Sequence, residues 1–283
     1  MKRFLIAFLA FLMVFSVFGC EKNGGQKETT SEAAGGESVA SPSYLLKDGL
    51  LQIGSEIGYP PFEMFDEDGK TVIGLDAELG RAIGKILGVE VKFIDAGFDG
   101  ILGGLKAEKY DIVMSAVTIT ADRAKEVDFS DPYIENWQAI AVKKGTTPIT
   151  SIKDLEGKKL GYQEGTTSKA YISLFIDKKQ LTCEEFEYPK IINCFDDLRQ
   201  GRVDAVLCDS VVADRYVADE PEVFEVTWNQ KDIPDEEPEL FGIAVRQGNS
   251  VLLGKINEAL AQLEADGTMD ALRTTWLAAG DAE

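Results

Sequence analysis

The chain has 283 residues, of which 29 are basic and 49 acidic, and a formal net charge of −20 at pH 7. This charge argues against nucleic acid and anionic membranes as partners, because binding to either depends on basic patches. The chain contains no histidine, which excludes Ser-His-Asp and Cys-His catalysis and a histidine-based zinc site within it.

The N-terminal residues have the pattern of an exported lipoprotein. The basic pair Lys2-Arg3 precedes an apolar run, Phe4–Phe18, which has the length of a signal-peptide core and is short for a membrane span. Val17-Phe18-Gly19-Cys20 then resembles a lipobox, in which the cysteine is lipidated after cleavage. We expect a signal peptide at residues 1–19 and a lipid anchor on Cys20; an uncleaved N-terminal anchor is the alternative. Either arrangement places the globular part on the extracytoplasmic face of the cytoplasmic membrane, at the cell surface or in a periplasm.

Residues 20–45 are expected to form the lipidated cysteine and a flexible tether. The stretch is rich in Gly, Ser, Thr, Glu and Lys and has almost no large apolar residue, so it cannot bury enough surface to fold. The acidic run Asp235-Glu236-Glu237-Pro238-Glu239 is likewise expected to be a solvated loop.

From residue 50 onward, strand-like runs alternate with helix-like ones. Strands are predicted at residues 50–55, 89–94, 112–115, 159–162 and 205–207. Helices are predicted at residues 76–87, 100–107, 168–175, 195–200, 210–217, 250–265 and 268–276. This rhythm predicts an α/β protein with open, mostly parallel sheets and helices on both sheet faces.

Three cysteines follow Cys20, and their number leaves at least one free thiol. Cys183 and Cys194 are the plausible disulfide pair, and Cys208 would then be free, although sequence cannot show that two side chains meet. None of these cysteines has CxxC spacing, so we expect no metal site and no cofactor.

One arginine carries the strongest functional signal. Small and hydroxyl residues end an apolar strand in Ser115–Thr120, and Arg123 follows a turn later. A guanidinium matches a carboxylate with two parallel hydrogen bonds, while nearby hydroxyls and backbone N–H groups take the remaining lone pairs. The pattern therefore predicts a carboxylate receptor; a surface arginine in the first turn of a helix is the alternative.

The whole string resembles the strand-loop signature of the bacterial extracellular solute-binding proteins for polar amino acids, family 3 of the binding-protein-dependent ABC importers. The resemblance extends from about residue 50 to about residue 277, and its landmarks occur in the family's order. They lie at residues 58–63, 74–79, 98–101, 115–133, 157–167, 201–209, 241–245 and 265–268.

The resemblance implies a two-lobed periplasmic-binding-protein fold with two chain crossovers and a ligand cleft between the lobes. Lobe 1 would hold residues 46–134 and 238–283, and lobe 2 would hold residues 138–233. The crossovers would lie at residues 134–138 and 234–241. In such proteins the lobes close on the ligand like a hinge.

The resemblance also assigns the groups of the ligand to residues of this chain. Arg123 would bind the α-carboxylate, with help from Thr118 and the backbone of Ala116. Thr166 and Thr167 lie at a helix N-terminus, where unpaired N–H groups favour the same carboxylate. A phosphate-binding P-loop is excluded there because no GxxxxGK[ST] motif is present.

Five further residues would complete the site, and three of them have plainer alternatives. Asp209 would bind the α-ammonium, and it could also cap the helix that begins at Ser210. Tyr59 and Phe98 would form aromatic walls, unless they are ordinary core residues. Ser115 would line the pocket, as would Cys208.

Glu56 and Gln163 bear on the choice of ligand. A Glu56 that faces the cleft would add a second carboxylate, beside Asp209, to a site with one arginine. Since a desolvated, unpaired charge is costly, Glu56 would favour a further donor or cation. We therefore expect a cationic or amide side chain on the ligand, as in arginine, lysine or glutamine.

The expected function is that of the substrate-binding component of an ABC importer, a non-enzyme that captures an amino acid and delivers it to a membrane permease. It is expected to be monomeric. One alternative is an exported enzyme on the same fold that resembles a cyclohexadienyl dehydratase, with Glu56 or Glu164 as its acid. Another is a receptor module that contacts a separate signalling partner.

Overall fold

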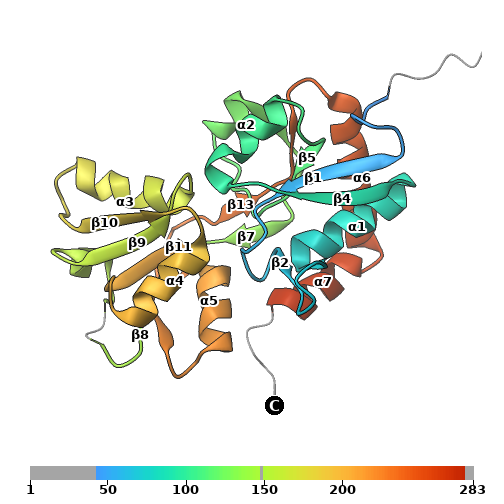
Figure 1. Ribbon diagram of the computed structural model, residues 1–283. Helices are drawn as coiled ribbons and strands as arrows, with labels where there is room; N and C mark the ends of the chain where they lie inside the picture. The colour runs from blue at the N-terminus through green and yellow to red at the C-terminus, as the bar shows by residue number, and fades with distance from the viewer. Residues whose placement is uncertain (1–42, 147–148, 278–283) are drawn as a thin grey trace, which may run out of the picture. The chain divides into compact units, whose positions relative to one another are not determined.

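The computed structural model describes residues 43–146 and 149–277, all within one compact unit (Figure 1). The predicted signal peptide, Cys20 and most of the tether lie outside the described residues. No helix in the described ranges is long and apolar enough to cross a bilayer.

The first sheet has five strands in the order β4-β1-β5-β14-β6. Their bounds are β1 Leu50–Ser55, β4 Glu90–Asp95, β5 Ile112–Val113, β6 Val127–Phe129 and β14 Ala244–Arg246. β1 is parallel to β4 and β5, whereas β14 is antiparallel to both β5 and β6. Three helices, α1 (Leu75–Leu87), α6 (Ser250–Ala265) and α7 (Thr268–Leu277), contact one another beside this sheet, and α2 (Ile101–Lys106) packs on β1, β5 and β14 (Figure 1).

The second sheet has five strands in the order β10-β9-β11-β8-β12. Their bounds are β8 Gln138–Lys143, β9 Lys159–Gln163, β10 Glu184–Tyr188, β11 Ala205–Asp209 and β12 Phe224–Asn229. Along β11, Ala205 and Leu207 join one buried cluster, while Val206 and Cys208 join another. This alternation places the helix α3 (Thr167–Asp177) on one face of the sheet, and α4 (Ile191–Gln200) with α5 (Ser210–Asp219) on the other.

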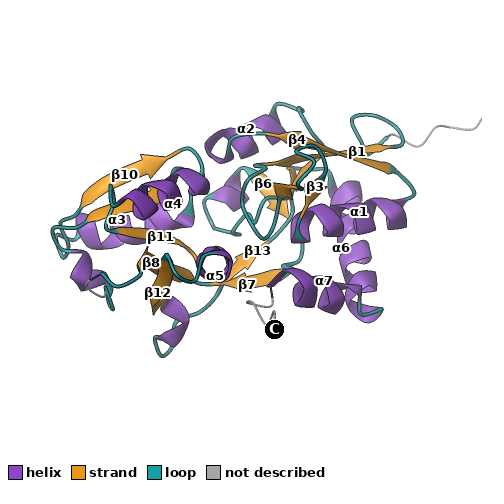
Figure 2. Cartoon of the chain, turned by 60° about the horizontal axis from the view of Figure 1, so that its bottom comes forward, coloured by secondary structure: helices purple, strands orange, loops and turns teal. Residues whose placement is uncertain are grey.

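Two short strands connect the sheets. β7 (Ile134–Asn136) precedes the second sheet and β13 (Glu239–Phe241) follows it, and the two pair antiparallel with Glu239 opposite Asn136 (Figure 2). The remaining elements are a two-stranded hairpin and four 3₁₀ turns. They are β2 Met64–Phe65, β3 Val72–Ile73, η1 Phe98–Gly100, η2 Arg123–Lys125, η3 Ile152–Leu155 and η4 Gln230–Asp232.

The predicted α/β class is confirmed, and each predicted strand and helix is present with boundaries that differ by a few residues at most. The expectation of mostly parallel sheets is wrong. In each sheet two of the four pairings are antiparallel, because the strand that enters after a crossover, β14 or β8, runs against its neighbours. The acidic run is not wholly a solvated loop either, since its last residue, Glu239, belongs to β13 and is partly buried.

The disulfide that the sequence left open between Cys183 and Cys194 is not formed, since Cys183, Cys194 and Cys208 are all free. Cys194 lies on the buried face of α4 and joins the cluster that contains Val206. Cys183 packs against the cluster on the opposite face of the second sheet, which contains Leu160. A sheet therefore separates the two side chains. Burial raises the pKa of the Cys183 thiol to about 11.

Candidate functional site

Side chains that follow strands of both sheets line one small cavity. Its lining consists of Tyr59, Phe98, Ala116, Thr118, Arg123, Gln163, Thr166, Thr167 and Asp209. All nine are residues predicted from the sequence. The space left between them is about 10 Å³, no more than one water molecule requires. The residues around this space thus already lie close together, and little room is left between them.

Arg123 contacts both sides of the cavity. Its Nη1 donates to the backbone oxygen of Thr118 at 2.8 Å, and its Nη2 donates to the backbone oxygen of Gly165 at 3.0 Å. The guanidinium carbon lies 5.4 Å from the centre of the Phe98 ring, within cation–π range. Burial lowers the pKa of Arg123, while Asp209 and Glu239 act in the opposite direction. The group stays a cation, and N–H donors beyond these two bonds are available for a carboxylate.

Asp209 ends β11 and is held by three donors. Its Oδ2 accepts from the Tyr59 hydroxyl, and its Oδ1 accepts from Asn136 Nδ2 at 2.7 Å and Gln138 Nε2 at 3.2 Å. Asp209 stands at the N-cap position of α5, but its side chain makes no hydrogen bond to the N–H groups of that helix. Burial, reinforced by the carboxylate of Glu239, raises the pKa of Asp209 to about 7. A cation placed beside Asp209 would favour the ionised form.

The two aromatic residues serve both the cavity and the core. Tyr59 is 7% exposed, and its ring stacks on Phe62 with the ring centres 6.4 Å apart. Phe98 packs against a buried cluster that includes Ile101 and lies under Arg123. Both therefore line the cavity while part of each ring is ordinary core.

Glu56 and Gln163 form a direct bond between segments of the two sheets. Gln163 Nε2 donates to Glu56 Oε2 and, at 3.2 Å, to the backbone oxygen of Pro189. Glu56 is fully buried, and its Oε1 has no hydrogen-bond partner among the described residues. Burial raises the pKa of Glu56 to about 7, and the Gln163 bond and the Lys190 charge oppose that rise.

Two of the predicted site residues, Glu56 and Ser115, do not line the cavity itself. Ser115 lies behind it, where its hydroxyl donates to Glu63 and accepts from the backbone N–H of Glu56 at 3.0 Å. Cys208 is also outside the lining, since it is buried in the cluster beneath α4 and α5.

The helix N-terminus that begins α3 has the expected geometry. Gly165 has a left-handed φ of +73°, and the Thr166 hydroxyl donates back to the Gln163 oxygen at 2.7 Å. Thr167 is the first residue of the helix, where backbone N–H groups have no partner within the helix. This turn brings the α3 N-terminus to the cavity beside Arg123.

A buried pair of acids, one on α1 and one just before β2, supports the cavity on the side of the first sheet. Asp76 Oδ2 accepts from the Ala116 N–H and the Tyr133 hydroxyl, each at 2.9 Å, and so holds Ala116 in its left-handed conformation at φ 46°. Glu63 is buried beside it and accepts from Ser115. Burial raises the pKa of Asp76 to about 7 and that of Glu63 well above its usual value.

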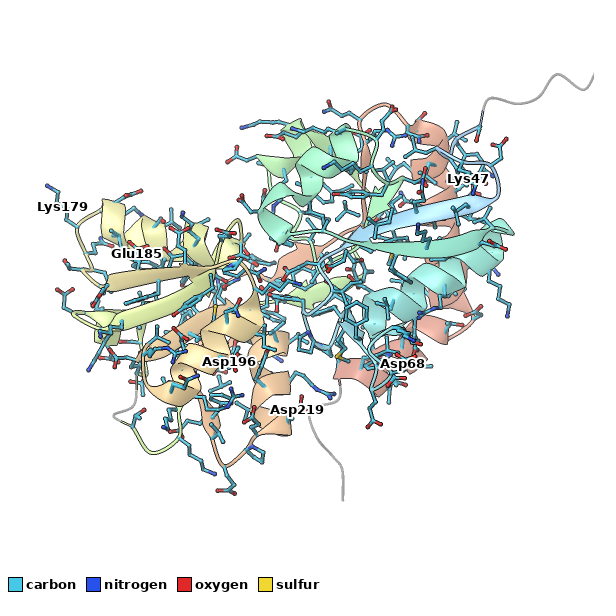
Figure 3. All side chains as sticks on the ribbon, in the orientation of Figure 1. Lys47, Asp68, Lys179, Glu185, Asp196 and Asp219 are labelled. Atoms are coloured by element: carbon cyan, nitrogen blue, oxygen red, sulfur yellow. The ribbon has the colours of Figure 1, made fainter. Side chains whose placement is uncertain are left out.

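Sequence reasoning missed three polar residues: Asn136 and Glu239 on the connecting strands β7 and β13, and Gln138 at the start of β8. Their side chains bond to Asp209, Thr167 and one another. The available signal was their position in the predicted crossovers, next to the cleft. Asn136 and Gln138 are buried and Glu239 is partly buried, in contrast to the charged side chain of Lys179, which extends into solvent (Figure 3).

Residues 51–279 match the family described as bacterial extracellular solute-binding proteins, family 3. The ABC transporter arginine-binding protein 1 of Escherichia coli (strain K12) is 34% identical over 80% of this chain and 90% of its own length. The L-cystine-binding protein TcyJ of the same strain is 34% identical over 82% of this chain and 84% of its own.

Solved structures with the two-lobed fold of periplasmic amino-acid-binding proteins superpose on the chain. An ancestral arginine-binding protein bound to arginine is 42% identical, with a TM-score of 0.75, and covers 81% of this chain and 98% of its own. An ancestral arginine-binding protein bound to glutamine is 41% identical, with a TM-score of 0.74, and the match again covers 81% of this chain and 98% of that protein. The chain therefore belongs to the bacterial extracellular solute-binding proteins, family 3.

Proposed function

We propose that this chain captures an L-amino acid with a cationic or amide side chain, arginine first among them, and delivers it to the permease of an ABC importer. The observation that carries the proposal is the convergence of Arg123 and Asp209 on one cavity from the two sheets. A zwitterion offers a carboxylate to the first and an ammonium to the second, so both ligand charges meet an opposite charge.

Glu56 supports the choice of side chain. It is buried behind the cavity, and one of its oxygens lacks a partner in the described part of the chain. A guanidinium, ammonium or amide N–H that reaches Glu56 would satisfy that oxygen and lower the pKa that burial has raised. Relatives named for arginine binding and a structure with bound glutamine agree with this choice.

The transport cycle that we propose uses the two crossovers as a hinge. Residues 46–134 and 238–283 would move as lobe 1, and residues 138–233 as lobe 2. Closure would form the contacts from Arg123 to Gly165 and from Gln163 to Glu56, which join segments of different sheets. A monomer, held outside the cytoplasmic membrane by a lipid on Cys20, would then dock on the permease.

We propose no catalytic role for the chain. Its cavity residues match the two charged groups of an amino acid, and its curated relatives include proteins named for arginine and cystine binding. Incubation with prephenate or arogenate should give no aromatic product; formation of one would support the dehydratase alternative.

A thermal-shift panel tests the proposal. The full chain, purified in detergent and freed of ligand by unfolding and refolding, is heated with each of the twenty amino acids, ornithine, citrulline and cystine. A ligand raises the free energy of unfolding by RT ln(1 + [L]/Kd), so a 1,000-fold excess over Kd adds about 4 kcal/mol. A rise in Tm with arginine, lysine, ornithine or glutamine is expected. A rise only with acidic or apolar amino acids would refute the proposed ligand class, and no rise at all would refute amino-acid binding.

A further inference from the structure

Glu239, on the connecting strand β13, takes donors from both sides of the cavity onto one oxygen. Its Oε2 accepts from Thr167 Oγ1 at 2.9 Å, from Gln138 Nε2 at 3.1 Å and, more weakly, from Thr118 Oγ1 at 3.4 Å. Thr118 follows β5 of the first sheet, whereas Thr167 begins α3 beside the second. One carboxylate thus links three segments that meet at the site.

The Thr167 hydroxyl has a single proton, and the shortest of its contacts, to the Glu239 carboxylate, takes that proton; its contact with the Thr118 hydroxyl is longer, at 3.5 Å. Its oxygen accepts from Gln138 Nε2 at 3.3 Å and donates to Glu239 at 2.9 Å. A hydroxyl offers one O–H donor, so Thr167 cannot donate to Glu239 and to a ligand at the same time. While this bond exists, the hydroxyl presents only lone pairs to the cavity.

The same hydroxyls lie where the ligand's carboxylate is expected. Thr118 and Thr167 line the cavity beside Arg123, whose charge attracts Glu239 as it would attract a ligand anion. A carboxylate bound there would accept hydrogen bonds from the Thr118 and Thr167 hydroxyls, which donate to Glu239 in this structure. It also places a second negative charge close to Glu239, and like charges at short range repel.

We propose that Glu239 is an internal competitor for the donors that bind the ligand's carboxylate, and that it sets the affinity of the site. The inference rests on the proposed function. A bound amino acid replaces Glu239 as the acceptor of the Thr167 proton, and the net binding free energy is what remains after that exchange.

Calorimetric titration of L-arginine into the wild-type chain and the Glu239→Gln variant tests the proposal. The glutamine side chain has the same length and keeps an acceptor oxygen but has no charge, so its hydrogen bond from the Thr167 hydroxyl is weaker and is exchanged more easily for one to the ligand. Since a hydrogen bond contributes about 0.5–1.5 kcal/mol net, affinity should increase by about 3- to 10-fold. Equal or weaker binding by Glu239→Gln would overturn the proposal. Glu239→Ala should show a gain of the same sign, and serves if Glu239→Gln does not fold.

Two further variants separate competition from other effects. Glu135→Gln removes an exposed charge from the paired strand β7 and should leave affinity unchanged. Thr167→Val removes the hydroxyl for which Glu239 and the ligand compete. In the Thr167→Val background, Glu239→Gln should therefore raise arginine affinity by less than half of the free-energy gain that it gives in the wild-type chain. An undiminished gain in affinity would overturn the assignment to Thr167. A wild-type chain that binds no amino acid would overturn the proposed function itself, whereas wild-type binding with no gain in Glu239→Gln overturns only this inference.

Discussion

Gly165 offers a direct test of closure, because its backbone packs closely against Asp99, which follows a strand of the first sheet. A Cβ built on Gly165 would lie 2.9 Å from the Cα and 3.1 Å from Oδ1 of Asp99, where carbon atoms prefer about 3.5–4.0 Å. The Gly165→Ala variant can close only if the two segments separate by roughly half an ångström or more. That separation would stretch the 3.0 Å bond from Arg123 Nη2 to the Gly165 oxygen beyond hydrogen-bond range.

The expected loss can be estimated from that bond. A hydrogen bond from a charged group contributes about 1.5–3 kcal/mol, so Gly165→Ala should weaken arginine binding by about 10- to 150-fold. Gly157→Ala is a matched control, since Gly157 has a φ of +70° and a Cβ added there would meet no atom within 4 Å. Both variants carry the left-handed backbone penalty of about 1 kcal/mol in the free energy of unfolding. Only Gly165→Ala should lose affinity by titration calorimetry; equal affinities in the two variants would refute the contact's role in closure.

Three further outcomes follow from the buried acids. Glu56→Gln should lower the affinity for arginine by about tenfold or more and the affinity for glutamine by less, because it removes a buried charge that pairs with a cation. Unchanged arginine affinity in titrations would contradict the role of Glu56. Arginine affinity should fall as pH drops from 8 to 5.5, since Asp209 and Glu56 have pKa values of about 7 and bind a cation when ionised, and a flat pH profile would contradict this. The ligand-free chain should be more stable at pH 5 than at pH 8 in chemical denaturation, and Asp76 alone should contribute about 2–3 kcal/mol to that difference, because its raised pKa, about 7, favours its protonated folded form. That contribution is complete below the unfolded pKa and is lost as pH rises through 7, so Asp76→Asn should reduce the pH 5 to pH 8 difference, whereas Asp68→Asn, which changes an exposed acid, should not; an undiminished difference in Asp76→Asn would contradict this reasoning.

Local sequence patterns predicted the helices well, because each has an apolar face and a clear end. Helix α6 occupies residues Ser250–Ala265 as predicted, with the side chain of Asn249 accepting from the Leu252 N–H at its start. Strand β10 was missed because four of its five residues, Glu184–Tyr188, are charged or carry a hydroxyl, as suits the edge of a sheet.

The cavity residues could be assigned because they lie in motifs that are contiguous in sequence, such as Gly165-Thr166-Thr167. Glu239 and Gln138 could not, since their roles depend on a contact between β13 and the start of β8, two segments that are 101 residues apart in sequence. Whether Cys183 and Cys194 form a disulfide could not be decided from sequence for a related reason: the pattern did not reveal which face of the second sheet each cysteine occupies.

Titration of the ligand-free chain with L-arginine and with agmatine, which is arginine without its carboxylate, tests the central claim most directly. If Arg123 and the α3 N-terminus bind the carboxylate, arginine should bind with a Kd near micromolar, about −8 kcal/mol, and agmatine should bind at least about 100-fold more weakly. Equal binding of the two compounds, or binding of neither, would contradict the account of this site as a receptor for the charged groups of an amino acid.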